Sequence, residues 1–304
     1  MYISEQDVRA VLTYESLIPA IGQALTDYSA GLVEQPARMI LRVGNAEGFR
    51  NGWFAVMPVI HGDVMGVKTV TFYPGNAELG LHTHMAVIEL LNRATGEPLA
   101  VMDGRLITEM RTAAVSAVAA AALAPATVTS LGILGSGVQA RAHIQALRLA
   151  LPQLEDVRIW SRTAAHGERL AAESGARAVT IEEAAGADVV VTVTASPAPV
   201  LEGRWLKAQA LVLAVGATGA NLRELDDAAM HSSYIVAESR TCAERESGDI
   251  RLSGVAADAE IGAILSGSAA APLGRRIVFK SVGMAIEDLT AARLVWQALD
   301  SQPR

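Results

Sequence analysis

The sequence predicts an α/β protein in which a doubly wound Rossmann domain is joined to a second, α+β domain. Between about residues 116 and 283, short apolar strands alternate with helical stretches, which is typical of a parallel sheet with crossover helices. A glycine-rich turn, "ILGSGVQA", joins the first of these strands to a helix. Residues 37–103 differ, because their Val-, Ile- and Phe-rich runs are broken by Gly, Pro and Asn.

The change of pattern also predicts the domain boundaries. We expect residues 116–283 to form the Rossmann domain, and residues 1–115 with a C-terminal helix over 284–304 to form the other domain. The Ala-rich stretch "ITEMRTAAVSAVAAAALA" predicts a slim helix between the two domains. The tail "GMAIEDLTAARLVWQALD" predicts an amphipathic helix that returns to the first domain.

Individual elements follow from spacing and from turn residues. From Ser4 to about Ala30 the apolar residues recur at three and four positions, so we expect one or two helices, with Ser4 as N-cap and Gly31 as the stop. Strands are predicted for "GWFAVMPVI" and "GVKTVTFY", and a hairpin for "HMAVIELLNRATGEPLAVMDG". In the second domain, strands are predicted for "VTSLGILG", "VRIWSR", "ADVVVTVT", "ALVLAVG" and "SYIVAES".

The bulk composition favours a protein that binds a diffusible small molecule. The 304 residues carry a formal charge of −7 and a pI near 5.4, which argues against nucleic acid and anionic membranes as partners. The single cysteine, Cys242, excludes a disulfide framework. The N-terminus "MYISEQDVRAVL" lacks the basic and apolar regions of a signal peptide, so we expect a soluble, cytoplasmic protein.

The glycine-rich turn predicts a dinucleotide site. Gly135 and Gly137 fit the first two positions of G-x-G-x-x-G/A, and Ala140 takes the third. The first glycine allows the tight turn, the second lets a pyrophosphate approach the backbone, and the small third residue lets the helix pack on the sheet. Val138 and Gln139 begin that helix, whose amides face the phosphates. NAD or NADP is therefore the expected cofactor.

The residues at the end of the next strand discriminate between NAD and NADP. An acidic residue there would bind the ribose 2′-hydroxyl and repel a 2′-phosphate. The sequence instead has Ser161, Arg162 and Thr163, which offer hydroxyls and a guanidinium, so NADPH is favoured over NADH. Ligands of open sheets lie at strand ends. Four residues at the ends of later strands are therefore further cofactor candidates: Thr194, Val215, Gly216 and Ala217.

Six ordered stretches resemble the ornithine cyclodeaminase and mu-crystallin family. They are "VKTVTFYPGN", "AVMDGRLITEMRTAAVSA", "ILGSGVQA", "AVGATGANLRELDD", "ESGDIRLSG" and "VFKSVGMAIEDLTAA". The similarity runs from about Pro36 to Leu294 and is closest to the ketimine (imino acid) reductase branch. It implies a Rossmann domain plus a substrate domain whose sheet pairs with that of a second subunit. It also implies an NAD(P)-dependent enzyme acting on the C=N or C–N bond of an imino or amino acid.

The resemblance also assigns roles to residues of this sequence. Arg38, Lys68 and Arg111 match the cations that hold the substrate α-carboxylate, and Arg111 is expected to contact the cofactor as well. Thr83 in "LHTHMA" matches a polar contact near the nicotinamide. Guanidinium suits this task because it binds a carboxylate through two parallel hydrogen bonds.

Three more positions complete the implied site. Ser281 and Val282 in "KSVGMA" match residues that line the cofactor and the substrate. Thr218 stands where ornithine cyclodeaminases have an Asp that serves in acid–base work on the amine. Threonine does not ionise at useful pH, so this position favours imine reduction over deaminating cyclisation.

His82 and His84 alternate in "LHTHMA", so on a strand they share one face while Thr83 points to the other. If Thr83 faces the site, the histidines face elsewhere, unless the strand starts later. The sequence shows no third residue that could complete a metal site with these histidines, so we expect no bound metal. The charged run "ERESGD", residues 244–249, is expected to be a solvated helix end.

Reduction of an imino acid needs a carboxylate clamp, a protonated imine and a hydride donor. The three cations supply the clamp, and a buried Lys68 is a hypothetical proton donor because desolvation disfavours its charged form. The substrate is a cyclic ketimine such as pyrroline-2-carboxylate, or an acyclic imine such as iminosuccinate or the imine of pyruvate. The competing functions are an ornithine-cyclodeaminase-like lyase and a ligand-binding protein that resembles mu-crystallin.

Overall fold

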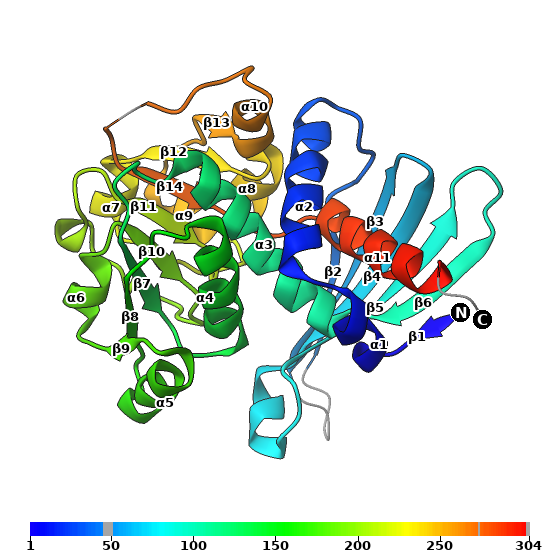
Figure 1. The fold of residues 1–304 in the computed structure, drawn as a ribbon, viewed down its shortest axis with the longest axis horizontal. Coiled ribbons are helices and arrows are strands. Elements are labelled where there is room, and N and C mark those ends of the chain that lie inside the picture. Colours follow the sequence, from blue (N-terminus) through cyan, green and yellow to red (C-terminus); the bar gives the residue numbers. More distant parts are fainter. Residues whose placement is uncertain (45–50, 273, 302–304) are drawn as a thin grey trace. The chain divides into compact units, whose positions relative to one another are not determined.

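A computed structural model describes residues 1–44, 51–272 and 274–301. The chain forms two compact units, Met1–Arg111 with Met284–Arg304, and Thr112–Gly283 (Figure 1). The sequence put this boundary at residue 115, four residues later in the same helix. The chain has an α/β fold, as predicted: the second unit is built on a parallel sheet and the first on a mainly antiparallel one.

The first unit contains a six-stranded sheet in the order β1-β6-β5-β4-β3-β2. Its strands are β1 (Tyr2–Ile3), β2 (Met39–Val43), β3 (Gly52–His61), β4 (Val64–Phe72), β5 (His84–Asn92) and β6 (Pro98–Asp103). All neighbouring pairs are antiparallel except β1 and β6. The predicted hairpin is confirmed as β5 and β6, and a 3-10 helix, η1 (Pro74–Leu79), lies between β4 and β5.

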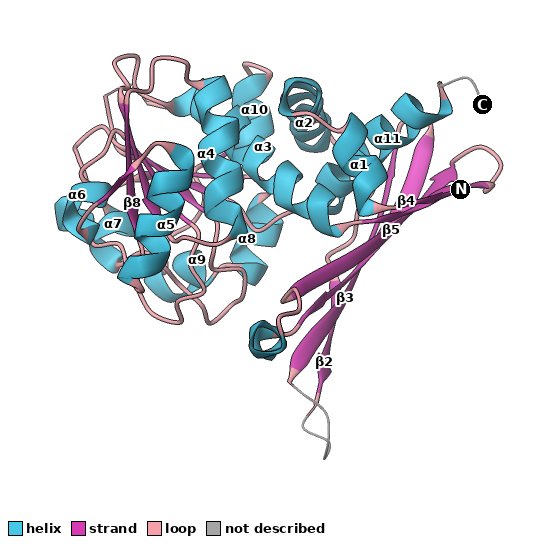
Figure 2. Ribbon diagram, turned by 60° about the horizontal axis from the view of Figure 1, so that its bottom comes forward, coloured by secondary structure: helices cyan, strands magenta, loops and turns pink. Residues whose placement is uncertain are grey.

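Three helices accompany this sheet: α1 (Glu5–Val11), α2 (Tyr14–Ser29) and α11 (Ala285–Asp300). Helix α11 packs on β3, β4 and β5, and α2 packs against α11; Figure 2 shows all three helices on one side of the sheet. Ser4 caps α1 in a reciprocal capping box with Asp7, which confirms the predicted start. The region forms two helices because Thr13 caps the second one.

The strands of this sheet have two distinct faces. On β5 the side chains of Ala86, Ile88 and Leu90 are buried, whereas those of Met85 and Val87, which alternate with them along the strand, are exposed. Alternation along an antiparallel strand produces this pattern when helices cover only one face. The apolar residues of the other face are therefore exposed within this single chain.

The second unit is built on an eight-stranded parallel sheet in the order β13-β12-β14-β11-β10-β7-β8-β9. Its strands are β7 (Ser130–Leu134), β8 (Asp156–Trp160), β9 (Arg177–Ala178), β10 (Val189–Thr192), β11 (Leu211–Ala214), β12 (Tyr234–Ala237), β13 (Ala259–Glu260) and β14 (Ile277–Lys280). The five predicted strands are confirmed as β7, β8, β10, β11 and β12. The order reverses at β7, from which the chain proceeds first to β8 on one side and later to β10 on the other. This reversal defines the topological switch point.

Helices connect the strands of this unit. They are α4 (Val138–Ala150), α5 (Ala164–Ser174), α6 (Ile181–Ala185), η2 (Gly203–Trp205), α7 (Asp227–His231), α8 (Arg240–Glu246), α9 (Gly248–Ser253) and α10 (Ile261–Leu265). The chain enters the unit within α3 (Arg105–Leu123), the predicted Ala-rich helix. Helix α3 is long and apolar enough to cross a bilayer, but 78% of that stretch is buried in the protein, as is usual for a core helix.

Candidate active site

The first unit buries two cations against two adjacent carboxylates. Lys68 Nζ lies 2.5 Å from Asp288 Oδ2, and Arg111 Nε lies 3.0 Å from Asp288 Oδ1. Arg111 Nη1 donates to Glu287 Oε2 at 2.5 Å. All four residues are buried. We call them the ion cluster of the first unit.

The fold brings these four side chains together from distant parts of the chain. Lys68 is buried on the same face of β4 as Val64 and Gly66, and a Cβ on Gly66 would lie 2.9 Å from Leu289 in α11. This face of β4 therefore meets the first turn of α11, which carries Glu287 and Asp288. The close approach at Gly66 lets Lys68 reach Asp288.

Burial and pairing shift the pKa values in the cluster. Burial opposes ionisation of Asp288, but Arg111 and Lys68 outweigh it and hold the pKa of Asp288 below its usual value. Burial lowers the pKa of Lys68 to about 8, with contributions from Arg111 and Arg38, although Asp288 opposes the shift. Arg38, in the segment before β2, is thus near enough to act on Lys68.

His82 and His84 lie in different environments in the structure. Strand β5 begins only at His84, so the later start considered in the sequence is the one that occurs. His84 shares a strand face with buried Ala86 and Ile88, and burial and the cations Lys68 and Arg111 lower the pKa of His84 to about 4. His82 is exposed, and Thr83 is half-buried with its carbonyl accepting a hydrogen bond from the Tyr73 amide. His84 is therefore the histidine that belongs to the electrostatic environment of the cluster.

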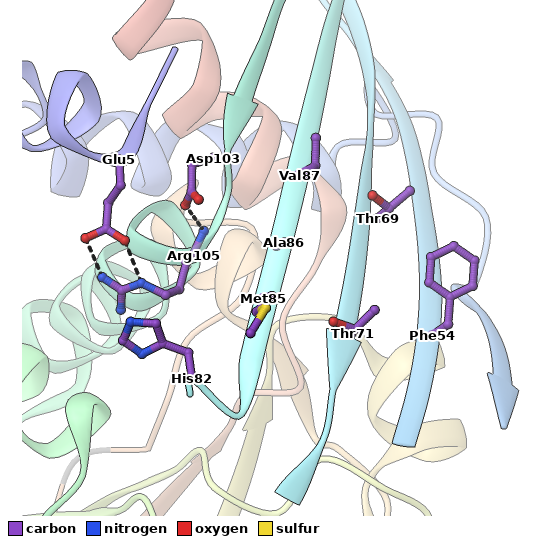
Figure 3. A pocket seen from close by; sticks show the side chains of 10 residues that line it. All are labelled: Glu5, Phe54, Thr69, Thr71, His82, Met85, Ala86, Val87, Asp103 and Arg105. Carbon is purple, nitrogen blue, oxygen red and sulfur yellow. Dashed lines mark hydrogen bonds and ion pairs between the residues drawn. The ribbon is translucent and has the colours of Figure 1, made fainter. Parts of the chain in front are cut away.

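A pocket of about 370 Å³ lies on the opposite face of the sheet (Figure 3). It is lined by Glu5, Phe54, Thr69, Thr71, His82, Met85, Ala86, Val87, Asp103 and Arg105. Figure 3 shows Glu5 paired with the Arg105 guanidinium, which lies beside His82. None of the predicted substrate residues lines this pocket, so it is separate from the ion cluster.

In the second unit, the turn between β7 and α4 fits a dinucleotide. Gly135 has φ +133°, and a Cβ there would lie 2.7 Å from the Val193 carbonyl oxygen, so only glycine is accommodated. Gly137 is the N-cap of α4, and a Cβ there would meet nothing within 4 Å. Ala140 is fully buried. The open space at Gly137, at the start of a 13-residue helix, suits a pyrophosphate.

The residues around this turn are accessible to different degrees. Val138 is exposed and Gln139 is half-buried at the start of α4. The Ser136 hydroxyl bonds to the Ser161 hydroxyl at 2.8 Å, which ties the turn to the end of β8. Arg162 and Thr163 are exposed, and no ion pair holds Arg162 in the described part of the chain. The guanidinium of Arg162 is therefore available to solvent.

The loops after β10 and β11 hold four of the predicted cofactor residues, of which Val215 and Ala217 are buried. Thr218, predicted as a catalytic position, follows them and is exposed. Thr194, Gly216 and Ala217 all donate to one carboxylate, that of Glu224. Ser281 and Val282, after β14, are buried.

Sequence reasoning missed four charged residues of the two units and misplaced a fifth. Glu287, Asp288, Glu224 and Lys280 are fully or almost fully buried. Asp249 was expected in a solvated helix end, which is wrong: it is fully buried and paired with Lys280. Glu287 and Asp288 stand in the first turn of α11, where acidic residues are common, so the local sequence carries no signal of their burial.

Comparison with known proteins identifies the family. The sequence profile of the ornithine cyclodeaminase/mu-crystallin family matches residues 1–302. This chain belongs to the ornithine cyclodeaminase/mu-crystallin family. It is 40% identical to ketimine reductase mu-crystallin of Mus musculus, over 99% of this chain and 97% of the mouse protein.

Two solved structures resemble this member of the ornithine cyclodeaminase/mu-crystallin family along nearly its whole length. The Δ1-pyrroline-2-carboxylate reductase of Thermococcus litoralis, in complex with NADH and L-proline, has a TM-score of 0.92 and 30% identity, covering 99% of this chain and 98% of that one. An archaeal alanine dehydrogenase dimer with bound NAD has a TM-score of 0.92 and 27% identity, covering 99% and 96%.

Removal of one carboxylate from the ion cluster tests its contribution to stability. We expect Asp288→Asn to lower the free energy of unfolding by about 3 kcal/mol at pH 7, because it leaves buried Lys68 and Arg111 undercompensated. Urea denaturation measures the effect, with Asp300→Asn at the exposed end of α11 as the control. Because the folded pKa of Asp288 is lowered, its stabilisation exists above its unfolded value, about 3.9, and is lost as pH falls through the folded pKa. A loss below about 1 kcal/mol at pH 7 would contradict the prediction.

Proposed function

We propose that this chain is an NAD(P)H-dependent reductase of small imino acids. It transfers hydride to the C=N carbon and yields the amino acid, and it runs in reverse as an amino acid dehydrogenase. The names of the three relatives given above describe a ketimine reductase, a Δ1-pyrroline-2-carboxylate reductase and an alanine dehydrogenase. A cyclic imino acid such as pyrroline-2-carboxylate is the substrate class that these names favour.

The ion cluster of the first unit is the observation that carries this proposal. Its two cations are buried beside two carboxylates, and Arg38 lies near enough to lower the pKa of Lys68. Three positive side chains thus gather where we propose that the substrate carboxylate binds. Arg38 lies in the irregular segment before β2 and is half-buried, so it is reachable by a ligand. We assign the substrate carboxylate to Arg38, Lys68 and Arg111, with Glu287 and Asp288 orienting the last two.

The chemistry divides between the cofactor and the side chains. The bound reduced cofactor supplies the hydride that the imine carbon accepts. The imine nitrogen must gain a proton, since C=N plus hydride plus proton gives the amine. Lys68 is the proposed proton source, because a pKa of about 8 lets it hold a proton at neutral pH and release it. The Thr218 hydroxyl carries no charge, so its proposed role is to orient the substrate by hydrogen bonding.

The established cofactor class is NAD(P), and we infer a preference for NADPH. The segment after β8 has hydroxyls and an exposed guanidinium but no carboxylate at Ser161, Arg162 and Thr163. A 2′-phosphate carries about two negative charges, which a free guanidinium binds through paired hydrogen bonds. The adenosine 2′-phosphate is therefore assigned to Arg162.

We also infer that the chain forms a homodimer through the uncovered face of its six-stranded sheet. Tyr2, Met85, Val87 and Val101 are exposed on this face. Exposed apolar side chains that cluster in this way mark an interaction surface. The archaeal relative is described as a dimer, so a second copy is the proposed occupant. We expect the protein to be soluble and cytoplasmic.

A panel of imines tests the function. We expect oxidation of NADPH, and more slowly of NADH, with preformed cyclic imines or with pyruvate, oxaloacetate or glyoxylate plus ammonia or methylamine. Ammonia release from ornithine with no net change in NAD(P)H would instead identify a lyase. Tight binding of NADPH without oxidation across the panel would identify a ligand-binding protein.

The pH profile of the best substrate tests Lys68. We expect kcat/KM to fall above about pH 8, because Lys68 is protonated below its pKa of about 8 and loses its charge above it. Lys68→Arg should remove this alkaline limb, since guanidinium stays charged, and should lower kcat by at least about tenfold because it does not release a proton. Lys68→Met should lose activity far more than stability. An unchanged alkaline limb in Lys68→Arg would remove Lys68 from the mechanism.

Cofactor choice is tested at one exposed side chain. We expect Arg162→Ala to weaken NADPH binding by about tenfold, the loss of one charge-assisted pair, and to leave NADH binding unchanged. Titration of each dinucleotide by its fluorescence measures both constants. Arg169→Ala, an exposed arginine on α5, is the control. Equal effects on both dinucleotides would refute the assignment.

The proposed dimer is tested on β5. We expect Val87→Glu to convert the dimer to a monomer, because a carboxylate would be buried without a partner in the interface. Light scattering after size exclusion measures the mass. Leu149→Glu, an exposed apolar residue on α4, should leave the mass unchanged. A wild-type chain that is monomeric at micromolar concentration would exclude the dimer.

A further inference from the structure

One buried carboxylate binds the two loops that follow β10 and β11. Glu224, in the segment between β11 and α7, is fully buried. Its Oε1 accepts hydrogen bonds from the amide and hydroxyl of Thr194, at 2.7 and 2.6 Å. Its Oε2 accepts from the Thr192 hydroxyl at 2.9 Å and from the amides of Gly216 and Ala217 at 2.8 and 3.1 Å. Five donors thus converge on one side chain, one from the end of β10 and four from the two loops.

A second buried pair supports this carboxylate. Asp249 Oδ1 accepts hydrogen bonds from the amides of Glu224 and Leu225, at 2.8 and 3.0 Å. Lys280 Nζ donates to Asp249 Oδ2 at 2.9 Å and to the carbonyl oxygen of Ala217 at 3.1 Å. Ala217 is therefore held at its amide by Glu224 and at its carbonyl by Lys280. Neither Asp249 nor Lys280 is exposed.

The two loops lie where a dinucleotide crosses the sheet. The pyrophosphate of a Rossmann ligand sits at the first glycine turn, here after β7, and its adenosine half lies toward the next strand, here β8. The other half extends past the switch point, over the carboxyl ends of β10 and β11. A Cβ on Gly216 would lie 2.3 Å from the Thr194 carbonyl oxygen, so the two loops touch through their backbones.

We propose that Glu224 is a positioning residue for the nicotinamide half of the dinucleotide. The inference rests on the proposed function and names the residue that sets the shape of its cofactor loops. Both carboxylate oxygens of Glu224 face only donors, and a carboxylate is the side chain that offers only acceptors. Glu224 acts through Thr194, Gly216 and Ala217. Asp249 and Lys280 fix the position of the segment that carries Glu224.

The substitution Glu224→Gln tests this role with little change of shape. An amide nitrogen would then oppose either the donors on Oε1 or those on Oε2, so at least one loop loses its hydrogen bonds. We expect the dissociation constant of the dinucleotide to rise at least tenfold. ADP-ribose, or its 2′-phosphate if NADPH is preferred, lacks the nicotinamide and should bind within twofold of wild type. Glu182→Gln, exposed on α6, is the matched control.

Thr192→Val keeps the test decisive if Glu224→Gln does not fold. It removes one hydroxyl donor from Oε2 in a fully buried side chain of nearly the same shape. We expect a two- to fivefold rise in the dissociation constant of the dinucleotide and no change for the fragment. Equal weakening of both ligands, or unchanged binding of the dinucleotide, would overturn the proposal. A wild-type chain that binds neither dinucleotide would contradict the proposed function instead.

Discussion

The first unit depends on the contact between the start of α11 and the buried face of β4. Two cations from the sheet and from α3 meet two carboxylates from the C-terminal helix. Buried charges are costly unless they are paired and hydrogen-bonded. The cluster therefore couples the last helix of the chain to strands more than two hundred residues earlier. A third cation, Arg38, acts on Lys68 from outside the cluster.

The second unit also depends on buried ionic groups, in this case carboxylates that accept hydrogen bonds from loop backbones. Loop backbones at the carboxyl end of a parallel sheet present amide donors that have no strand partner. Glu224 accepts hydrogen bonds from several of them, and Asp249 accepts from two more. Lys280 donates to Asp249 and to the carbonyl oxygen of Ala217. Buried polar networks whose members are all hydrogen-bonded make the surrounding structure rigid. Each unit thus uses buried ionic groups to set the geometry of segments that we propose to bind ligands.

The parts of the fold that were predictable are those encoded locally. Ser4 and the apolar spacing after it define a capped helix, and Gly135 is required by a positive φ and a close carbonyl. The counter-ions of Lys68 were not predictable in this way, because Glu287 and Asp288 look like ordinary acidic residues at a helix start. Asp249 in "ERESGD" looked solvated for the same reason: local sequence does not reveal that Lys280 lies opposite. The side of the sheet on which His84 lies was not predictable either, because it depends on the exact residue at which β5 starts.

The titration behaviour of the cluster narrows the choice of proton source. Burial and two neighbouring cations lower the pKa of His84 to about 4, so at neutral pH its ring is uncharged and has no proton to spare as an acid. Asp288 is ionised, because Arg111 and Lys68 keep its pKa low. Lys68 is protonated at neutral pH with a pKa of about 8, close to the working pH where general acids are most effective. Burial and Arg111 thus keep His84 neutral and also lower the pKa of Lys68. We propose that this one environment both attracts the substrate carboxylate and supplies the proton that the imine needs.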